Sequence, residues 1–214
     1  MSESPLNTHA GPIAVIAGGL FALAHLGQFA VMDPSNLVTM MTNPAFQLFS
    51  AAYAITFPLL LIALVALYWR QAHAAGVFGA VAFCIAVIGT VALAGDMWFE
   101  GFASPWIARV APAMFSADRT GSSLVTAWLV TVVLFALGWA LFGLASWRAR
   151  VFPVPMSLAL GVAGLIGFQA AMPPWGVPLG LAVAAVGVWL IRHDRTVGAG
   201  AKHVAAAIRT DHRK

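Results

Sequence analysis

Long apolar runs, separated by short polar or proline-containing segments, make up almost the whole chain. A helix needs roughly 20 apolar residues to cross the hydrocarbon core of a bilayer. In lipid, a single segment satisfies all its own backbone hydrogen bonds only as a helix, so the runs predict helices and not strands. Six helices are expected, over residues 12–32, 45–69, 75–100, 122–147, 155–172 and 176–191.

The composition agrees with a membrane protein. The 214 residues are 61% hydrophobic and 8% charged, whereas soluble domains carry about 25% charged residues. We therefore expect an all-α, multi-pass protein of the cell membrane. Residues 1–195 would form one bundle of six transmembrane helices, and residues 196–214 a basic, flexible cytoplasmic tail.

A signal peptide and a cysteine-based structure are both disfavoured. The first helix could be mistaken for a signal peptide, but the segment before Pro12 contains Glu3 and no Lys or Arg, so we expect a retained helix. The single cysteine, Cys84, excludes an intrachain disulfide and a cysteine-rich metal site.

The distribution of Lys and Arg predicts the orientation. If the N-terminus is cytoplasmic, the cytoplasmic segments hold nine Lys and Arg residues, and the outer loops hold only Arg109 and Arg119. Positive charge concentrates in cytoplasmic loops, so both termini should face the cytoplasm. The long outer loop, residues 101–121, mixes aromatic and charged residues, which predicts a short interfacial helix between the third and fourth helices.

Given this orientation, the polar residues of five helices gather at the outer side of the membrane. The inner halves are almost purely Ala, Val, Leu, Ile, Gly and Phe. Such an arrangement favours a pocket that opens outward or into the outer leaflet. The outer polar residues are His25, Gln28, Gln47, Ser50, Tyr53, Asp96, Glu100, Ser122, Ser123, Thr126, Thr131 and Gln169.

Asp96 and Glu100 are the candidate catalytic acids, with His25 as their partner. The two acids are four residues apart and share a helix face, and His25 lies about two turns inside the first helix. Such a pair is a candidate acid, proton carrier or cation ligand. Two plainer interpretations stay open: both acids reach interfacial water at a helix end, and His25 is a satisfied interior histidine. We expect Asp96, the deeper acid, to face the bundle interior near His25, Gln28, Ser123 or Thr126.

Aromatic residues surround the acid pair. They either form the aromatic belt at the membrane boundary or line an apolar ligand pocket. We expect neither a metal nor a cofactor, because His25 and the two acids are too few ligands and no second histidine lies at a depth suited to haem. The candidate ligand-binding residues are Gln28, Tyr53, Trp98, Phe99, Trp106, Ser123, Thr126 and Gln169.

Three stretches carry a resemblance to a known group. "GDMWFEGFASPWIARVAP", "VLFALGWALFGLASWRARVFP" and "MPPWGVPLG" resemble a widespread set of small multi-helix bacterial membrane proteins, common in actinobacteria. That resemblance implies a fold and a membrane setting, with no particular activity. The general plan is also similar to that of membrane-bound terpene cyclases, which are short, all-helical, cofactor-free and dependent on intramembrane carboxylates.

Two functions from different classes follow, with a third as the plain alternative. In the first, the pocket binds an apolar ligand such as a lipid or isoprenoid, and an acid protonates it, as in a cyclase or isomerase. In the second, the acids couple proton or cation movement to transport or resistance. In the third, the protein is a structural or sensory membrane partner. No nucleic acid is expected as a partner, and glycine-rich helices such as the one with Gly161, Gly164 and Gly167 favour close packing, including in a homodimer.

Overall fold

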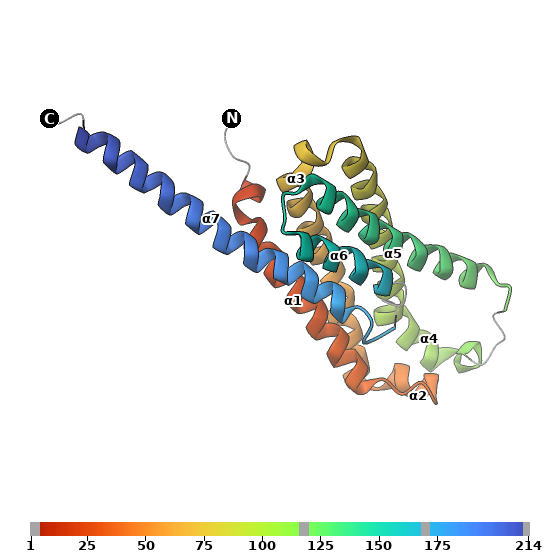
Figure 1. Ribbon diagram of the computed structural model, residues 1–214. Helices are drawn as coiled ribbons and strands as arrows, with labels where there is room; N and C mark the ends of the chain where they lie inside the picture. The colour runs from red at the N-terminus through yellow and green to blue at the C-terminus, as the bar shows by residue number, and fades with distance from the viewer. Residues whose placement is uncertain (1–4, 116–119, 168–171, 212–214) are drawn as a thin grey trace.

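The computed structural model describes residues 5–115, 120–167 and 172–211, and this part of the chain is all-helical, without strands (Figure 1). Four helical segments in it are long and apolar enough to cross a membrane: Thr8–Val31, Pro44–Val110, Ser123–Ala149 and Val177–Thr196. A fifth apolar helix, Val154–Ile166, is shorter. The elements are α1 (Pro5–Val31), α2 (Leu37–Thr42), α3 (Pro44–Trp98), η1 (Phe99–Ala103), α4 (Ser104–Val110), η2 (Pro112–Phe115), α5 (Ser123–Ala149), α6 (Val154–Ile166) and α7 (Val177–Asp211).

Helix α3 is a hairpin of two antiparallel halves. Gly76 has non-helical backbone angles, φ 58° and ψ −154°, a region that glycine tolerates because it lacks a Cβ. The rings of Tyr68 and Phe83 stack with centroids 4.1 Å apart, although 15 residues of straight helix would separate them by roughly 22 Å. The chain therefore reverses at Gly76, between the helices predicted over residues 45–69 and 75–100, as Figure 1 shows.

The second half of α3 does not end at Glu100, as the sequence had suggested. It continues through the π-helical turn η1 into α4 and ends at Val110. In the wide turn the Ser104 N–H donates to the Phe99 carbonyl oxygen, five residues back. Pro105 explains the widening, because a proline has no N–H and its ring clashes with the carbonyl of Gly101, four residues earlier. The two acids therefore lie inside a continuous helical segment.

Close glycine contacts join α1 to α7. A Cβ added at Gly18 would lie 2.3 Å from the Gly180 oxygen, and one at Gly187 would lie 2.6 Å from the Gly11 oxygen. Both contacts bring one backbone against the other, so the two helices pack without intervening side chains. Gly180 therefore serves close packing of α7 on α1.

Close glycine contacts also join α5 to α6. A Cβ at Gly143 would lie 2.3 Å from the Gly161 nitrogen, and one at Gly164 would lie 2.6 Å from the Ala140 nitrogen. The predicted close-packing role of Gly161 and Gly164 is confirmed, and within a single chain. The large core side chains nearby include Trp139, whose Nε1 donates to Thr90 Oγ1 of α3 at 3.1 Å.

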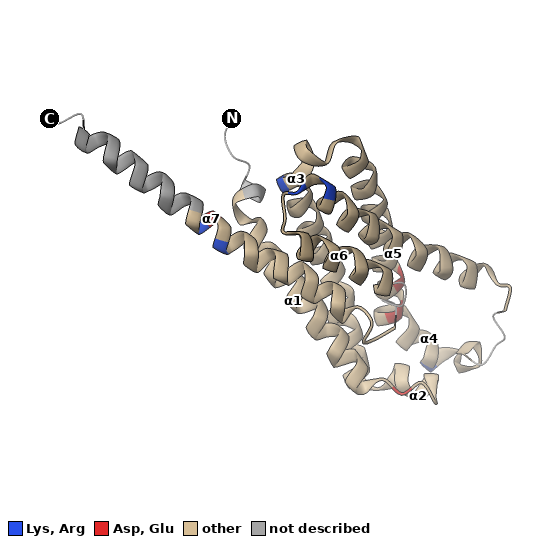
Figure 2. Ribbon diagram, viewed as in Figure 1, with Lys and Arg blue, Asp and Glu red and all other residues tan. Residues whose placement is uncertain are grey.

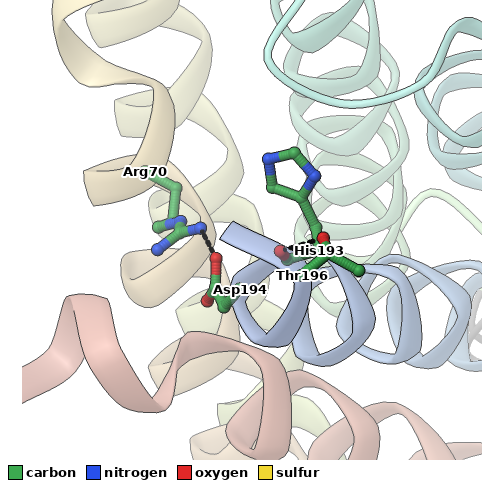
Figure 3. A network of polar contacts seen from close by, with 4 residues as sticks. All are labelled: Arg70, His193, Asp194 and Thr196. Carbon is green, nitrogen blue, oxygen red and sulfur yellow. Dashed lines mark hydrogen bonds and ion pairs between the residues drawn. The ribbon is translucent and has the colours of Figure 1, made fainter. Parts of the chain in front are cut away.

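Charged residues separate along the bundle. In Figure 2 most of the described Lys and Arg lie at the end formed by the α3 turn and the middle of α7, and the described acidic residues other than Asp194 lie toward α2 and α4. At the basic end Arg70 of α3 and Asp194 of α7 form an ion pair of 2.5 Å, drawn in Figure 3 beside the bond from Thr196 Oγ1 to the His193 carbonyl oxygen. The ion pair ties the α3 hairpin to α7.

Helix α7 runs without a break through Thr196 to Asp211. The boundary expected between a domain of residues 1–195 and a flexible tail of residues 196–214 therefore lies within a helix. Figure 1 shows this part of α7 extending away from the bundle.

Candidate functional site

A buried polar contact joins α1 to both halves of the α3 hairpin. Gln28 Nε2 of α1 donates to Ser50 Oγ of the first half at 3.1 Å and to Glu100 Oε1 of η1 at 2.8 Å. Gln28 and Ser50 are each 2% exposed. Both amide hydrogens of Gln28 are thus used, while its Oε1 is buried and has no hydrogen-bond partner among the described residues.

Gly101 explains how Glu100 comes so close to the first half of α3. A Cβ at Gly101 would lie 3.1 Å from the Ser50 oxygen, which is tighter than ordinary contact. The missing side chain lets the π-helical turn approach the backbone at Ser50. Pro105, which widens the turn, and Gly101, which lets it pack, together place the Glu100 carboxyl beside Gln28.

His25 lies one helical turn before Gln28 and is fully buried. Its ring contacts Phe21, with centroids 4.7 Å apart, and Tyr53, with centroids 4.3 Å apart. Neither ring nitrogen has a hydrogen-bond partner among the described residues. Gly176, just before α7, closes over the ring, since a Cβ there would lie 1.8 Å from Nε2. The structure therefore shows no bond from His25 to either acid, and no carbonyl partner for it.

The acid that contacts the buried residues is not the one that we expected. We expected Asp96 to face the interior and Glu100 to lie outside, but Glu100 makes the contact with buried Gln28. The reason is that Glu100 lies in η1, where the hydrogen bond spans five residues instead of four and the wider turn changes the direction of the side chain. Asp96 is half-buried, and its carboxylate has no hydrogen bond or ion pair among the described residues. It lies near enough to act electrostatically on Glu100 and Tyr53.

Several predicted site residues are not brought to this cluster. Ser123 and Thr126 are exposed, and the Thr126 hydroxyl bonds the Ser122 oxygen within its own helix. The reason is that the first turns of α5, residues 123–130, are exposed throughout and extend beyond the bundle in Figure 1. Gln169 lies outside the described residues.

The aromatic residues around the acids point outward. Trp98, Phe99 and Trp106 are 60%, 49% and 64% exposed. Exposed aromatic rings at one level of a membrane protein are typical of the belt at the lipid–water boundary. Tyr53 differs from them, because it is 1% exposed and packs on His25. Of the predicted aromatic ligand-binding residues, Tyr53 is the one that belongs to the buried cluster.

Two polar residues near the site have other partners. Arg109 of α4 bonds Gln47 Oε1 at 3.3 Å and forms no ion pair with Glu100. Asp33 is a turn residue: its Oδ1 accepts from the N–H and the hydroxyl of Ser35, which lowers the pKa of its carboxyl.

The cluster thus consists of His25, Gln28, Ser50, Tyr53 and Glu100, with Asp96 at its edge. Sequence reasoning placed Ser50 among the outer polar residues but not in the site. Its position three residues before Tyr53, on the same face of α3, was the available signal. Sequence reasoning also missed the role of Gly176, because the contact with His25 joins residues far apart in the chain.

The described residues contain no group of three or more His, Cys, Asp or Glu that could hold a metal ion. Comparison with protein-family models, curated proteins and solved structures found no match to the chain.

Proposed function

We propose that this chain crosses the cell membrane six times, with both termini in the cytoplasm. The reversal at Gly76 supports two crossings by α3, and the short apolar helix α6 would add another to those of α1, α5 and α7. The basic end of the bundle, with Arg70 and the middle of α7, supports a cytoplasmic position by the positive-inside rule. The polar cluster would then lie in the outer half of the membrane, and α4 at the outer interface.

We propose that the cluster binds the polar end of an apolar ligand, such as a membrane lipid or isoprenoid, and exchanges a proton with it through Glu100. The observation that carries this proposal is the Glu100–Gln28–Ser50 contact, which joins three helical segments inside a largely apolar bundle. Polar and ionisable groups in a membrane are costly, and they are typical of functional sites.

Each residue has a distinct role in this proposal. Glu100 is the proton donor or acceptor, because its carboxyl is the acid held by the buried amide. Gln28 orients that carboxyl through its bond to Oε1. Asp96 is a second acid, half-buried on the same helical segment. Through the negative charge that it adds, it would favour the protonated form of one of the two. The ring of Tyr53 forms the apolar wall beside His25.

The experiment uses purified protein in lipid nanodiscs, incubated with isoprenoid lipids. Bound lipid is identified by native mass spectrometry, and any new product by chromatography. We expect the wild type to retain a lipid and to convert it, and Glu100→Gln to lose the conversion, because an amide cannot deliver a proton. Asp33→Asn is the matched control, since Asp33 is an exposed carboxyl in a turn. A wild type that retains no lipid and forms no product refutes the proposal.

A further inference from the structure

The polar cluster contains hydrogen-bond acceptors to which no described residue donates. Both hydrogens of the Gln28 amide are used by Ser50 and Glu100, so no donor on that side chain is left. The Gln28 Oε1, by contrast, is buried without a partner. The Asp96 carboxylate adds two acceptor oxygens to which no described residue donates. A partner that binds Gln28 Oε1 and the Asp96 oxygens must therefore bring N–H or O–H donors, since the unpaired His25 ring makes no bond to them.

The cluster also has no positive charge to balance the two carboxyl groups. The described residues contain one ion pair, between Arg70 and Asp194, and it lies at the opposite end of the bundle. Arg109 is engaged with Gln47. Two ionised carboxylates inside a membrane without a cation are each costly. Either protons or a bound cation must neutralise them.

A metal ion fits this cluster poorly. No group of three or more His, Cys, Asp or Glu comes together in the described residues, and the oxygen-binding cations need about six ligands. An organic ammonium needs fewer contacts, because each N–H meets one acceptor and its alkyl part remains in lipid.

We infer that the ligand of this site is an amphipathic amine, bound as an ammonium ion by Glu100, Asp96 and Gln28 Oε1 in exchange for a proton. This inference rests on the proposed function and specifies its ligand class. The amine enters from the outer leaflet with its apolar chain in lipid. Its N–H groups donate to one oxygen of each carboxylate and to the amide oxygen that now has no partner. The proton held by the acid pair leaves to water as the ammonium binds, so one positive charge replaces another and the net charge of the site does not change.

The chemistry predicts an order among ligands. A primary alkylammonium has three donors and one charge, and it satisfies the acceptors and the carboxylates together. A quaternary ammonium of the same chain length has the charge but no N–H, so it leaves Gln28 Oε1 without a partner. An alcohol of the same length has a donor but no charge. We expect affinity to fall in that order.

The experiment measures binding of dodecylamine, dodecyltrimethylammonium and dodecanol to the full chain in nanodiscs of neutral lipid by calorimetry. Repeating the amine titration in buffers of different ionisation enthalpy gives the protons released. For the amine, we expect binding roughly tenfold or more tighter than for the quaternary ion, since hydrogen bonds to charged groups contribute about 1.5–3 kcal/mol. Release of about one proton is expected, with tighter binding as pH rises while the amine stays charged. The titratable groups that interact with Glu100 are Asp96 and Tyr53, and His25 packs against the ring of Tyr53.

The variants separate the amine inference from the proposed function. Glu100→Gln should lose proton release and weaken amine binding by roughly tenfold or more, while Asp33→Asn should match the wild type. Gln28→Leu should weaken the binding of the amine more than that of the quaternary ion. Circular dichroism shows whether this variant is folded. If it is not folded, the result for Glu100→Gln tests the amine inference instead. Equal binding of amine and alcohol, unchanged by Glu100→Gln, overturns the amine inference and leaves apolar ligand binding standing. If none of the three probes binds, and the wild type also retains no lipid, both proposals fall.

Discussion

The contact between α1 and α7 gives the sharpest test of the packing, because two adjacent glycines of α1 differ in what they face. Gly18 lies against α7, where an added Cβ would be 2.3 Å from the Gly180 oxygen and 2.7 Å from the Ala184 nitrogen. At Gly19 the added Cβ would meet nothing within 4 Å. Gly18→Ala and Gly19→Ala are therefore a matched pair in the same helix.

The magnitude follows from these distances. Ordinary van der Waals contact begins at 3.4 Å, so the Gly18→Ala methyl group is short by roughly 1 Å against backbone atoms that cannot rotate away. Overpacking of this kind typically costs about 1–3 kcal/mol. Both substitutions gain the same helix propensity of about 1 kcal/mol, so the difference between the two variants isolates the contact.

The assay is equilibrium unfolding in mixed micelles with increasing SDS, followed by circular dichroism. We expect Gly18→Ala to have a free energy of unfolding about 1–3 kcal/mol below that of Gly19→Ala. Adding Gly180→Ala to Gly18→Ala should cost less than Gly180→Ala alone, because the helices have already separated. Two variants of equal stability, within about 0.5 kcal/mol, would refute the close backbone contact.

Three further predictions concern other parts of the molecule. Thr90→Val should lower the free energy of unfolding by about 1–3 kcal/mol in the same assay, because it leaves the Trp139 Nε1 donor buried without an acceptor. Thr90→Ser keeps the hydroxyl, so its loss of stability should be smaller. Gly176→Ala should destabilise through its clash with the His25 ring, and adding His25→Ala should relieve part of the loss; additive losses would contradict the contact. A reporter enzyme fused after Lys214 should be active in a cytoplasmic assay, and periplasmic activity would overturn the proposed orientation.

The hydrophobic pattern predicted where the helices lie because their boundaries are set by local chemistry. The first helix ends before Asp33–Pro34, and α1 ends at Val31. The sequence could predict that glycines would lie at helix contacts, since small residues let helices approach each other closely. Which glycines meet, as Gly18 meets Gly180, depends on how the helices cross, and one sequence carries little information about that.

The candidate site could be predicted only in part. The identities of His25, Gln28 and Glu100 as interior polar residues follow from their place in apolar runs. The choice between Asp96 and Glu100 failed, because a regular helix was assumed through both. The exposed start of α5 was not foreseen either, since an apolar helix that lies in lipid and one that packs on protein have the same composition.

The π-helical turn η1 makes the direction of Glu100 dependent on residue count rather than on residue identity. Its hydrogen bond from the Ser104 N–H reaches the Phe99 carbonyl oxygen five residues back, one residue more than in an α-helix. Removing one residue from η1, such as Phe102, would let the segment return to α-helical spacing while α3 and α4 keep their own register. The Glu100 carboxyl would then point elsewhere, with every residue of the cluster still present in the sequence. A homologue that retains both acids but has one residue fewer between Glu100 and Pro105 would therefore lack this site.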